Sequence, residues 1–210
     1  MSSITIIGAG NMARGIAGRA LAGGHVVEIF ARDLEKAKAL GHDLNVSSTG
    51  GLDDVPAGDI VVLAVPYEAA LNVVQQFGDR LADKTIVDIT NPVDFSTFSG
   101  MVTPADTSAA QEVARQLPPS ASVVKAFNTT FAGTLASGEV GGQPLDVFVA
   151  GDDPDTKAAV TALIESSGMR AVDVGDLHMA RYLEGLGFLH MSIQTTQGGN
   201  FATGVKVLGI

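Results

Sequence analysis

The chain has 210 residues, of which 46% are hydrophobic and 17% charged, so it can form a core and is not a disordered chain. Its formal net charge of -10 argues against nucleic acid or an anionic membrane as the main partner, because both bind basic surfaces. The absence of cysteine excludes a disulfide framework, a thiolate metal site and catalysis by a thiol.

Short apolar runs alternate with helix-forming segments along the chain. The predicted strands are 4–7, 25–31, a weak 44–48, 59–66, 85–90, 122–127, 146–150 and 171–174. The predicted helices are 11–22, 34–40, 67–81, 107–117, a short one within 128–138, 154–167 and 178–197. The longest apolar run, 60–65, is too short to span a membrane, and no basic segment precedes the first strand. We therefore expect no signal peptide and a cytoplasmic protein.

This alternation predicts an α/β fold. Strands without polar alternation suit a sheet that is buried on both faces, and the intervening helices make right-handed crossovers. The pattern therefore indicates a doubly wound, mostly parallel sheet of the Rossmann type, with a small C-terminal αβ annex that ends in a long helix.

A glycine-rich turn joins the first predicted strand to the first predicted helix. Residues 8–13 (GAGNMA) fit the pattern G-x-G-x-x-G/A in the strand–turn–helix context of a dinucleotide-binding turn. Gly8 permits the tight turn, Gly10 lets the backbone approach a pyrophosphate, and Ala13 lets the helix pack on the strand. Amides at the start of the helix would face the phosphates. The predicted cofactor-binding residues here are Gly8, Ala9, Gly10, Asn11 and Met12.

The end of the second predicted strand distinguishes NAD from NADP. This strand ends at Ala31, Arg32 comes next, and Lys36 follows one helical turn later. An NAD site has an acid here for the ribose 2′-hydroxyl, whereas cations suit a 2′-phosphate. We therefore expect NADP(H) and include these three residues in its site. Two other interpretations remain open: both cations are solvated partners of Asp33 and Glu35, or Asp33 contacts the ribose.

Two further strand ends fall at the same edge of the predicted sheet. Ala64, Val65 and Pro66 end the fourth strand, and Asn91 and Pro92 follow the fifth. Ligands on open α/β sheets bind outside the carboxyl ends of the strands. We expect backbone groups at 64 and 65 to line the ribose and diphosphate, and the Asn91 amide to meet the nicotinamide ribose or carboxamide. Asn91 is equally typical of a turn that satisfies its own loop.

The chain resembles the family of F420-dependent NADP oxidoreductases, small Rossmann proteins that pass hydride between NADP(H) and a deazaflavin coenzyme. The similar segments are 8–15, Ala31-Arg32 with Lys36, Ala64-Val65-Pro66, 87–92 (VDITNP), 108–112 (SAAQE), 124–129 (VKAFNT), 149–153 (VAGDD) and Arg181-x-x-Glu184. The resemblance implies an NADP-dependent oxidoreductase with a deazaflavin, coenzyme F420, or another small acceptor as co-substrate. Archaeal members tend to carry His within the segment 127–129 (FNT), so we expect a smaller, more polar pocket here.

Hydride transfer between two cofactors needs no side-chain nucleophile, because the protein supplies distance, orientation and a dry pocket. We expect Asn91, Asn128 and Thr129, at strand ends facing the nicotinamide, to be the catalytic positioning groups. Lys125, within a strand, is expected to point outward. Arg181 and Glu184 are expected to form a simple i,i+3 pair.

The four histidines lack metal-ligand spacing, so we expect no metal site. His190 is expected to be a packed or interface residue. The helix that carries it, 178–197, is apolar on more than one face, which indicates burial against a second subunit or against its own sheet.

We expect one domain over residues 1–210, with 1–120 forming the NADP-binding core and 121–210 completing the pocket and a homodimer interface. The expected partner is a small-molecule electron acceptor or donor, with no nucleic acid and no membrane. Two alternatives remain. One is a non-catalytic NADP sensor or regulator whose 93–104 loop contacts a protein. The other is a reductase of small carbonyl or imine substrates, although only about 35 residues follow the last strand, fewer than a helical second domain needs.

Overall fold

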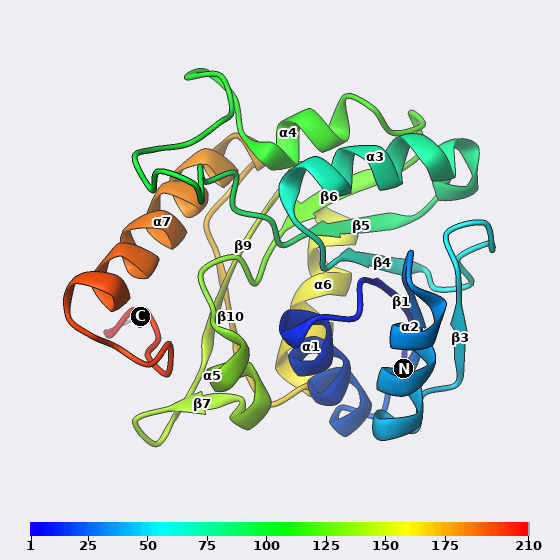
Figure 1. Ribbon diagram of the computed structural model, residues 1–210, viewed down its shortest axis with the longest axis horizontal. Helices are drawn as coiled ribbons and strands as arrows, with labels where there is room; N and C mark the ends of the chain where they lie inside the picture. Colours follow the sequence, from blue (N-terminus) through cyan, green and yellow to red (C-terminus); the bar gives the residue numbers. More distant parts are fainter. Residues whose placement is uncertain (210) are drawn as a thin grey trace.

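An eight-stranded sheet organises the part of the chain that the computed structural model describes, residues 1–209 (Figure 1). Its strands are β1 (Ser3–Ile7), β2 (Val26–Phe30), β3 (Ser48–Gly50), β4 (Ile60–Leu63), β5 (Thr85–Asp88), β6 (Ser122–Lys125), β9 (Asp146–Gly151) and β10 (Arg170–Asp173). The spatial order is β10-β9-β6-β5-β4-β1-β2-β3, and every neighbouring pair is parallel except β6 and β9. The predicted doubly wound, mostly parallel sheet is confirmed.

Helices cover both faces of this sheet. They are α1 (Asn11–Ala22), α2 (Leu34–Leu44), α3 (Tyr67–Phe77), α4 (Ala109–Ala114), α5 (Ala132–Ser137), α6 (Pro154–Ser166) and α7 (Ala180–Thr196), with 3₁₀ helices at Gly78–Leu81 and Leu177–Met179. Side chains alternate between faces along a strand. Ile4 and Ile6 therefore share a core with Ile16 of α1, whereas Ile7 packs in a second core with Val74 of α3. Because β1, β2, β4, β5 and β6 run in the same direction, the loops that follow them lie at one edge of the sheet.

Two local predictions differ most from the structure. The weak strand at 44–48 is wrong at its start: α2 continues to Leu44 and ends at Asn45, which adopts a left-handed conformation (φ 55°, ψ 49°), before β3 begins at Ser48. The helix expected at 107–117 is only the six residues of α4. Outside the main sheet, Gly141 and Gly142 form a two-residue turn that joins the short strands β7 (Glu139–Val140) and β8 (Gln143–Pro144).

The C-terminal segment is fixed to the sheet by a buried carboxylate. The side chain of Asp146, at the start of β9, is inaccessible to solvent. It accepts hydrogen bonds from Arg170 Nε at 2.8 Å, from Lys206 Nζ at 2.6 Å and from the Val207 amide at 2.9 Å. Burial alone would raise the pKa of Asp146, but these donors hold it at about 2.

Replacement of Asp146 by Asn is expected to make the free energy of unfolding depend less on pH below about pH 4. Because the folded-state pKa lies below the ordinary 3.8, the contribution of Asp146 is complete above about pH 4 and is lost as the pH falls toward about 2. The wild-type free energy of unfolding should lose about 2 kcal/mol more than that of Asp146→Asn across this interval. Urea denaturation at a series of pH values measures the difference, and parallel curves would contradict this assignment.

Helix α7 buries only one of its faces within the chain. Leu183, Glu184 and His190 are buried, whereas Leu189 and Ile193 are 57% and 47% exposed. The homodimer interface expected on this helix stays a prediction. Within residues 1–209, every helix is too short or too polar to cross a membrane.

Candidate functional site

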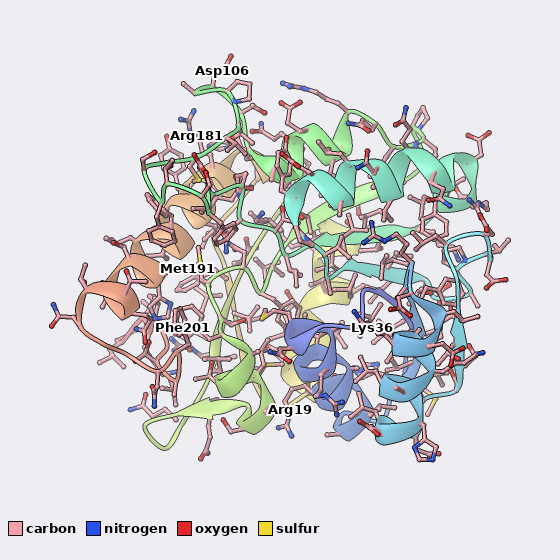
Figure 2. The ribbon with its side chains drawn as sticks, viewed as in Figure 1. Arg19, Lys36, Asp106, Arg181, Met191 and Phe201 are labelled. Carbon is pink, nitrogen blue, oxygen red and sulfur yellow. The ribbon has the colours of Figure 1, made fainter. Side chains whose placement is uncertain are left out.

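A cleft of about 560 Å³ lies along the carboxyl edge of the sheet, where β1, β2 and β4 end. It brings together predicted cofactor residues from the segments that follow three strands: Gly8, Ala9, Gly10, Ala31, Arg32, Lys36, Ala64, Val65 and Pro66. Asn11 and Met12 lie beside it in the first turn of α1, outside its lining. Figure 2 shows Lys36 on α2, on the side that faces α1.

The start of α1 is open toward this cleft. Gly10 forms the N-cap of the helix, provides no side-chain cap, and is followed by a first turn without acidic residues. By contrast, Asp33 caps α2 and Asp153 caps α6 through their carboxylates. The first amides of an uncapped helix lack intrahelical partners and carry the positive end of its dipole. This end of α1 can therefore receive a phosphate group.

The two glycines of the turn perform different tasks. Gly8 has φ 127°, and a Cβ there would lie 2.2 Å from the Ala64 carbonyl oxygen, so the turn requires glycine at this position. A Cβ at Gly10 would meet no atom within 4 Å and would project into open space. Gly8 is thus required by the backbone conformation of the turn, whereas the absence of a side chain at Gly10 leaves the backbone amides accessible to a ligand in the cleft.

The cations at the end of β2 are available to a ligand. Arg32 is exposed and forms no ion pair within residues 1–209. The Lys36 ammonium is 74% exposed and lies 3.7 Å from Asp33, a distance at which the pair is weak. Glu35 instead pairs with Lys38 at 2.9 Å. Pairing of these cations with the neighbouring acids is thus limited to the loose contact between Lys36 and Asp33. Asp33 also lines the cleft, so the alternative that it contacts the ribose stays open.

Part of the cleft was missed by sequence reasoning. The opposite wall comes from α3 and from the turn after β3, through Leu52, Ala69, Asn72, Val73 and Gln76. Asn72 and Gln76 are four residues apart and so share one face of α3. This polar pair was the available signal, but it becomes informative only when α3 is known to line the same cleft as Arg32.

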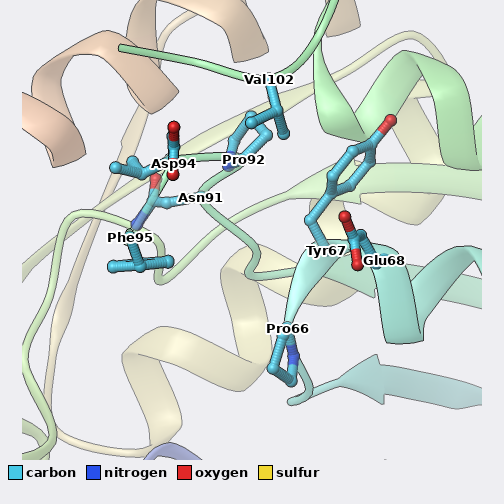
Figure 3. A pocket seen from close by; sticks show the side chains of 9 residues that line it. Pro66, Tyr67, Glu68, Asn91, Pro92, Asp94, Phe95 and Val102 are labelled. Carbon is cyan, nitrogen blue, oxygen red and sulfur yellow. The ribbon is translucent and has the colours of Figure 1, made fainter. Parts of the chain in front are cut away.

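A second cavity of about 260 Å³ adjoins the first, and Pro66 lines both (Figure 3). Figure 3 shows Tyr67 and Glu68 at the start of α3, across from Asn91 and Pro92. Burial, together with nearby carboxylates, raises the pKa of Tyr67, so its hydroxyl is protonated at neutral pH. Hydrogen bonds from Ser96 and Thr97 hold the pKa of Asp94 at about 2. The cavity thus combines apolar walls with a hydroxyl donor and an ionised carboxylate.

The three predicted positioning residues lie together, but not all of them face a cavity. Asn91 lines the second cavity, and its Nδ2 donates to the Asn128 carbonyl at 2.7 Å. Asn128 Nδ2 donates back to Asn91 Oδ1 at 2.9 Å. Asn128 and Thr129 are only 4% and 3% exposed. Both hydrogen bonds of the Asn91 side chain join it to the loop after β6, whereas the alternative of a turn residue that satisfies its own loop requires partners next to Asn91 in the chain.

His190, on α7, packs against the loop that carries Thr129. Its ring nitrogens lie 3.1 Å from the Thr129 carbonyl oxygen and 2.8 Å from Thr203 Oγ1, and its ring packs against Phe131. Burial lowers the pKa of His190, which favours the neutral ring. The prediction of a packed histidine is confirmed.

Two predictions about charged residues are wrong. Lys125 does not point outward: its side chain is 0% exposed and pairs with Asp88 and Glu184. Glu184 does not pair with Arg181, which instead lies over the ring of Tyr182. Glu184 faces the core and accepts from Lys125 Nζ at 2.8 Å and from the Ala109 amide at 3.0 Å. Burial raises the pKa of Glu184 in spite of the neighbouring ammonium.

The strand order, the glycine turn and the cleft define a Rossmann-type α/β protein, and comparison with known proteins gives its family. The family model described as NADP oxidoreductase, coenzyme F420-dependent, matches residues 3–92. An F420-dependent NADP reductase of Methanothermobacter thermautotrophicus is 32% identical over 200 residues, which cover 88% of this chain and 85% of the relative. The chain belongs to the family of F420-dependent NADP oxidoreductases.

Two solved structures resemble this chain, and one of them agrees with the family assignment. The crystal structure of a candidate F420-dependent NADP reductase from Arthrobacter sp. FB24 matches all of this chain and all of its own, with a TM-score of 0.86 and 27% identity. An imine reductase from Bacillus cereus has a TM-score of 0.64 at 19% identity, and this chain spans 62% of it. That second likeness concerns the fold alone.

Proposed function

We propose that this protein is an NADP(H)-dependent oxidoreductase that exchanges a hydride with a deazaflavin of the coenzyme F420 type. The observation that carries the proposal is the convergence, in one cleft, of the uncapped start of α1 and of Arg32, which has no ionic partner in residues 1–209, with an adjoining cavity at Pro66. The names of the family and of the relatives above support the same chemistry.

The residues present fit an NADP molecule that extends along the edge of the sheet. The amides that follow Gly10 would hold the diphosphate, and Arg32 with Lys36 would hold the 2′-phosphate of the adenosine. The face of α3 that carries Asn72 would cover the adenine side of the cleft. The nicotinamide end would then reach past Pro66 toward Asn91.

The protein's contribution to the reaction is orientation. When both are bound, the two cofactors supply the hydride chemistry themselves. Asn91 would orient the nicotinamide end, Tyr67 would offer a hydrogen-bond donor to the acceptor, and the apolar side chains of Pro92 and Val102 would exclude water from the second cavity. No side chain needs to act as a nucleophile.

Turnover tests this proposal directly. The protein is mixed with NADPH and either an oxidised deazaflavin or the oxidised flavin FMN, and the loss of NADPH absorbance is followed. We expect NADPH oxidation with the deazaflavin and at least about tenfold slower oxidation with the flavin. Tight binding of NADPH without turnover on any acceptor, including small imines and carbonyls, would instead indicate a non-catalytic NADP sensor or regulator. Turnover only with an imine or carbonyl would indicate the small-substrate reductase.

A further inference from the structure

A charged cluster is buried directly beneath the wall of the second cavity. The side chains of Lys125, Asp88 and Glu184 are 0%, 0% and 1% exposed. Lys125 Nζ donates to Asp88 Oδ2 at 2.7 Å, to Glu184 Oε1 at 2.8 Å and to the Thr90 carbonyl at 2.5 Å. All three donors of the ammonium are used, and Thr90 precedes the cavity residue Asn91.

The two carboxylates extend this cluster to other elements. Asp88 Oδ1 accepts from the Thr90 amide at 3.0 Å, so both backbone groups of Thr90 are held. Glu184 accepts from the Ala109 amide at 3.0 Å, at the start of α4. The cluster therefore joins the end of β5, the end of β6, α4 and α7 at one point.

A pair of amide side chains makes the second connection between α7 and the cavity wall. Asn128, which exchanges hydrogen bonds with Asn91, also donates to the Leu183 carbonyl of α7 at 2.8 Å. A Cβ at Gly187, one turn along α7, would lie 2.6 Å from Asn91 Oδ1 and 3.0 Å from the Asn128 carbonyl oxygen. The absence of a side chain at Gly187 therefore allows the helix to contact the amide pair.

Stability alone does not explain this arrangement. Buried ion pairs are often replaceable by apolar residues without loss of stability, because desolvation offsets the attraction between the charges. Here one ammonium serves two carboxylates, and the hydride chemistry uses none of the three groups. What such a cluster supplies is fixed geometry, since each of its charged atoms has partners in defined directions.

We propose that Lys125, Glu184 and Gly187 are positioning residues that hold Asn91 at the cavity where the nicotinamide and its acceptor meet. This inference rests on the proposed function, because it assigns the second cavity to the acceptor. The cluster and the glycine act through Thr90 and the amide pair, and they do not touch the bound substrates themselves.

Gly187→Ala tests the inference with Gly185→Ala as its matched control, since a Cβ at Gly185 on the same helix would meet no atom within 4 Å. We expect Gly187→Ala to displace Asn91 and to lower kcat about tenfold or more at saturating NADPH, with the Kd for NADPH within about threefold of wild type. Gly185→Ala should retain wild-type kcat, acceptor KM and NADPH Kd.

Glu184→Gln tests the same point without adding bulk. An amide offers one acceptor oxygen where the carboxylate offers two, so either Lys125 or Ala109 loses a partner. Asp146→Asn is the control, because the side chain of Asp146 is equally buried and accepts from a lysine, an arginine and an amide. Asp146 lies at the start of β9, whereas Lys125 pairs with Ala150 near the end of that strand. We expect kcat to fall about tenfold in Glu184→Gln and to remain at the wild-type value in Asp146→Asn.

The side-chain amide NMR signals of Asn91 and Asn128 in the ligand-free protein provide a readout that is independent of turnover. They should shift in Gly187→Ala and Glu184→Gln and stay in place in the two controls. Unchanged signals, or wild-type kcat and acceptor KM in both variants, would overturn the inference while leaving the proposed function intact. A wild-type protein that turns over no acceptor would overturn the proposed function instead.

Discussion

Replacing Arg32 and Lys36 together by alanine is expected to weaken NADPH binding about 100-fold while changing NADH binding less than about threefold. Both side chains line the cleft, and within residues 1–209 Arg32 has no ionic partner that would compete with a phosphate. A hydrogen bond to a charged group contributes about 1.5–3 kcal/mol, and because Arg32 and Lys36 are exposed to solvent, we expect each to contribute near the lower end of this range. Their sum corresponds to about two powers of ten in Kd.

Calorimetric titration with both dinucleotides measures this selectivity. Lys38→Ala is the matched control, because Lys38 is a cation on the same helix that lies outside the lining of the cleft. It should leave both dissociation constants within about twofold of wild type. Equal losses for NADPH and NADH in the double variant would remove the argument for a 2′-phosphate at this position.

Alanine at Gly8 and alanine at Gly10 are expected to fail in different ways. Gly8→Ala places a Cβ 2.2 Å from the Ala64 carbonyl oxygen in a backbone conformation with φ 127°, so we expect a loss of more than about 3 kcal/mol in the free energy of unfolding. Gly10→Ala meets no protein atom and has extended backbone angles (φ −91°, ψ −173°), so its stability should fall by about 1 kcal/mol or less.

Binding separates the two variants further. The new methyl group at residue 10 would occupy the space through which a diphosphate approaches the α1 amides, so we expect Gly10→Ala to weaken NADPH about 50-fold or more. Thermal unfolding and titration of the same sample measure both quantities. A stable Gly8→Ala protein, or a Gly10→Ala protein with wild-type affinity, would show that the turn does not work as described.

The dinucleotide half of the site could be predicted from the sequence because its determinants are local. Gly8, Gly10 and Arg32 each follow a strand by one to three residues, and parallel strands bring their carboxyl ends to one edge whatever the details of packing. Likewise, Asp33 could be identified as a helix cap from its position alone, and its carboxylate does accept from the Lys36 amide. Such signals extend over a few residues and can be recognised without knowledge of the rest of the chain.

The tertiary structure alone decided how the other half is held. Lys125 looks like a solvated strand residue and Glu184 like half of a surface pair on a helix, and 59 positions separate them in the chain. They meet because β6 lies in the interior of the sheet and α7 folds back across its end, which removes both charges from water. Their partners in the described part of the chain are each other, Asp88 and backbone groups. Burial of a charge depends on every element packed around it. The residue pattern within one segment does not show which elements those are, so it could not predict the burial of Lys125 and Glu184.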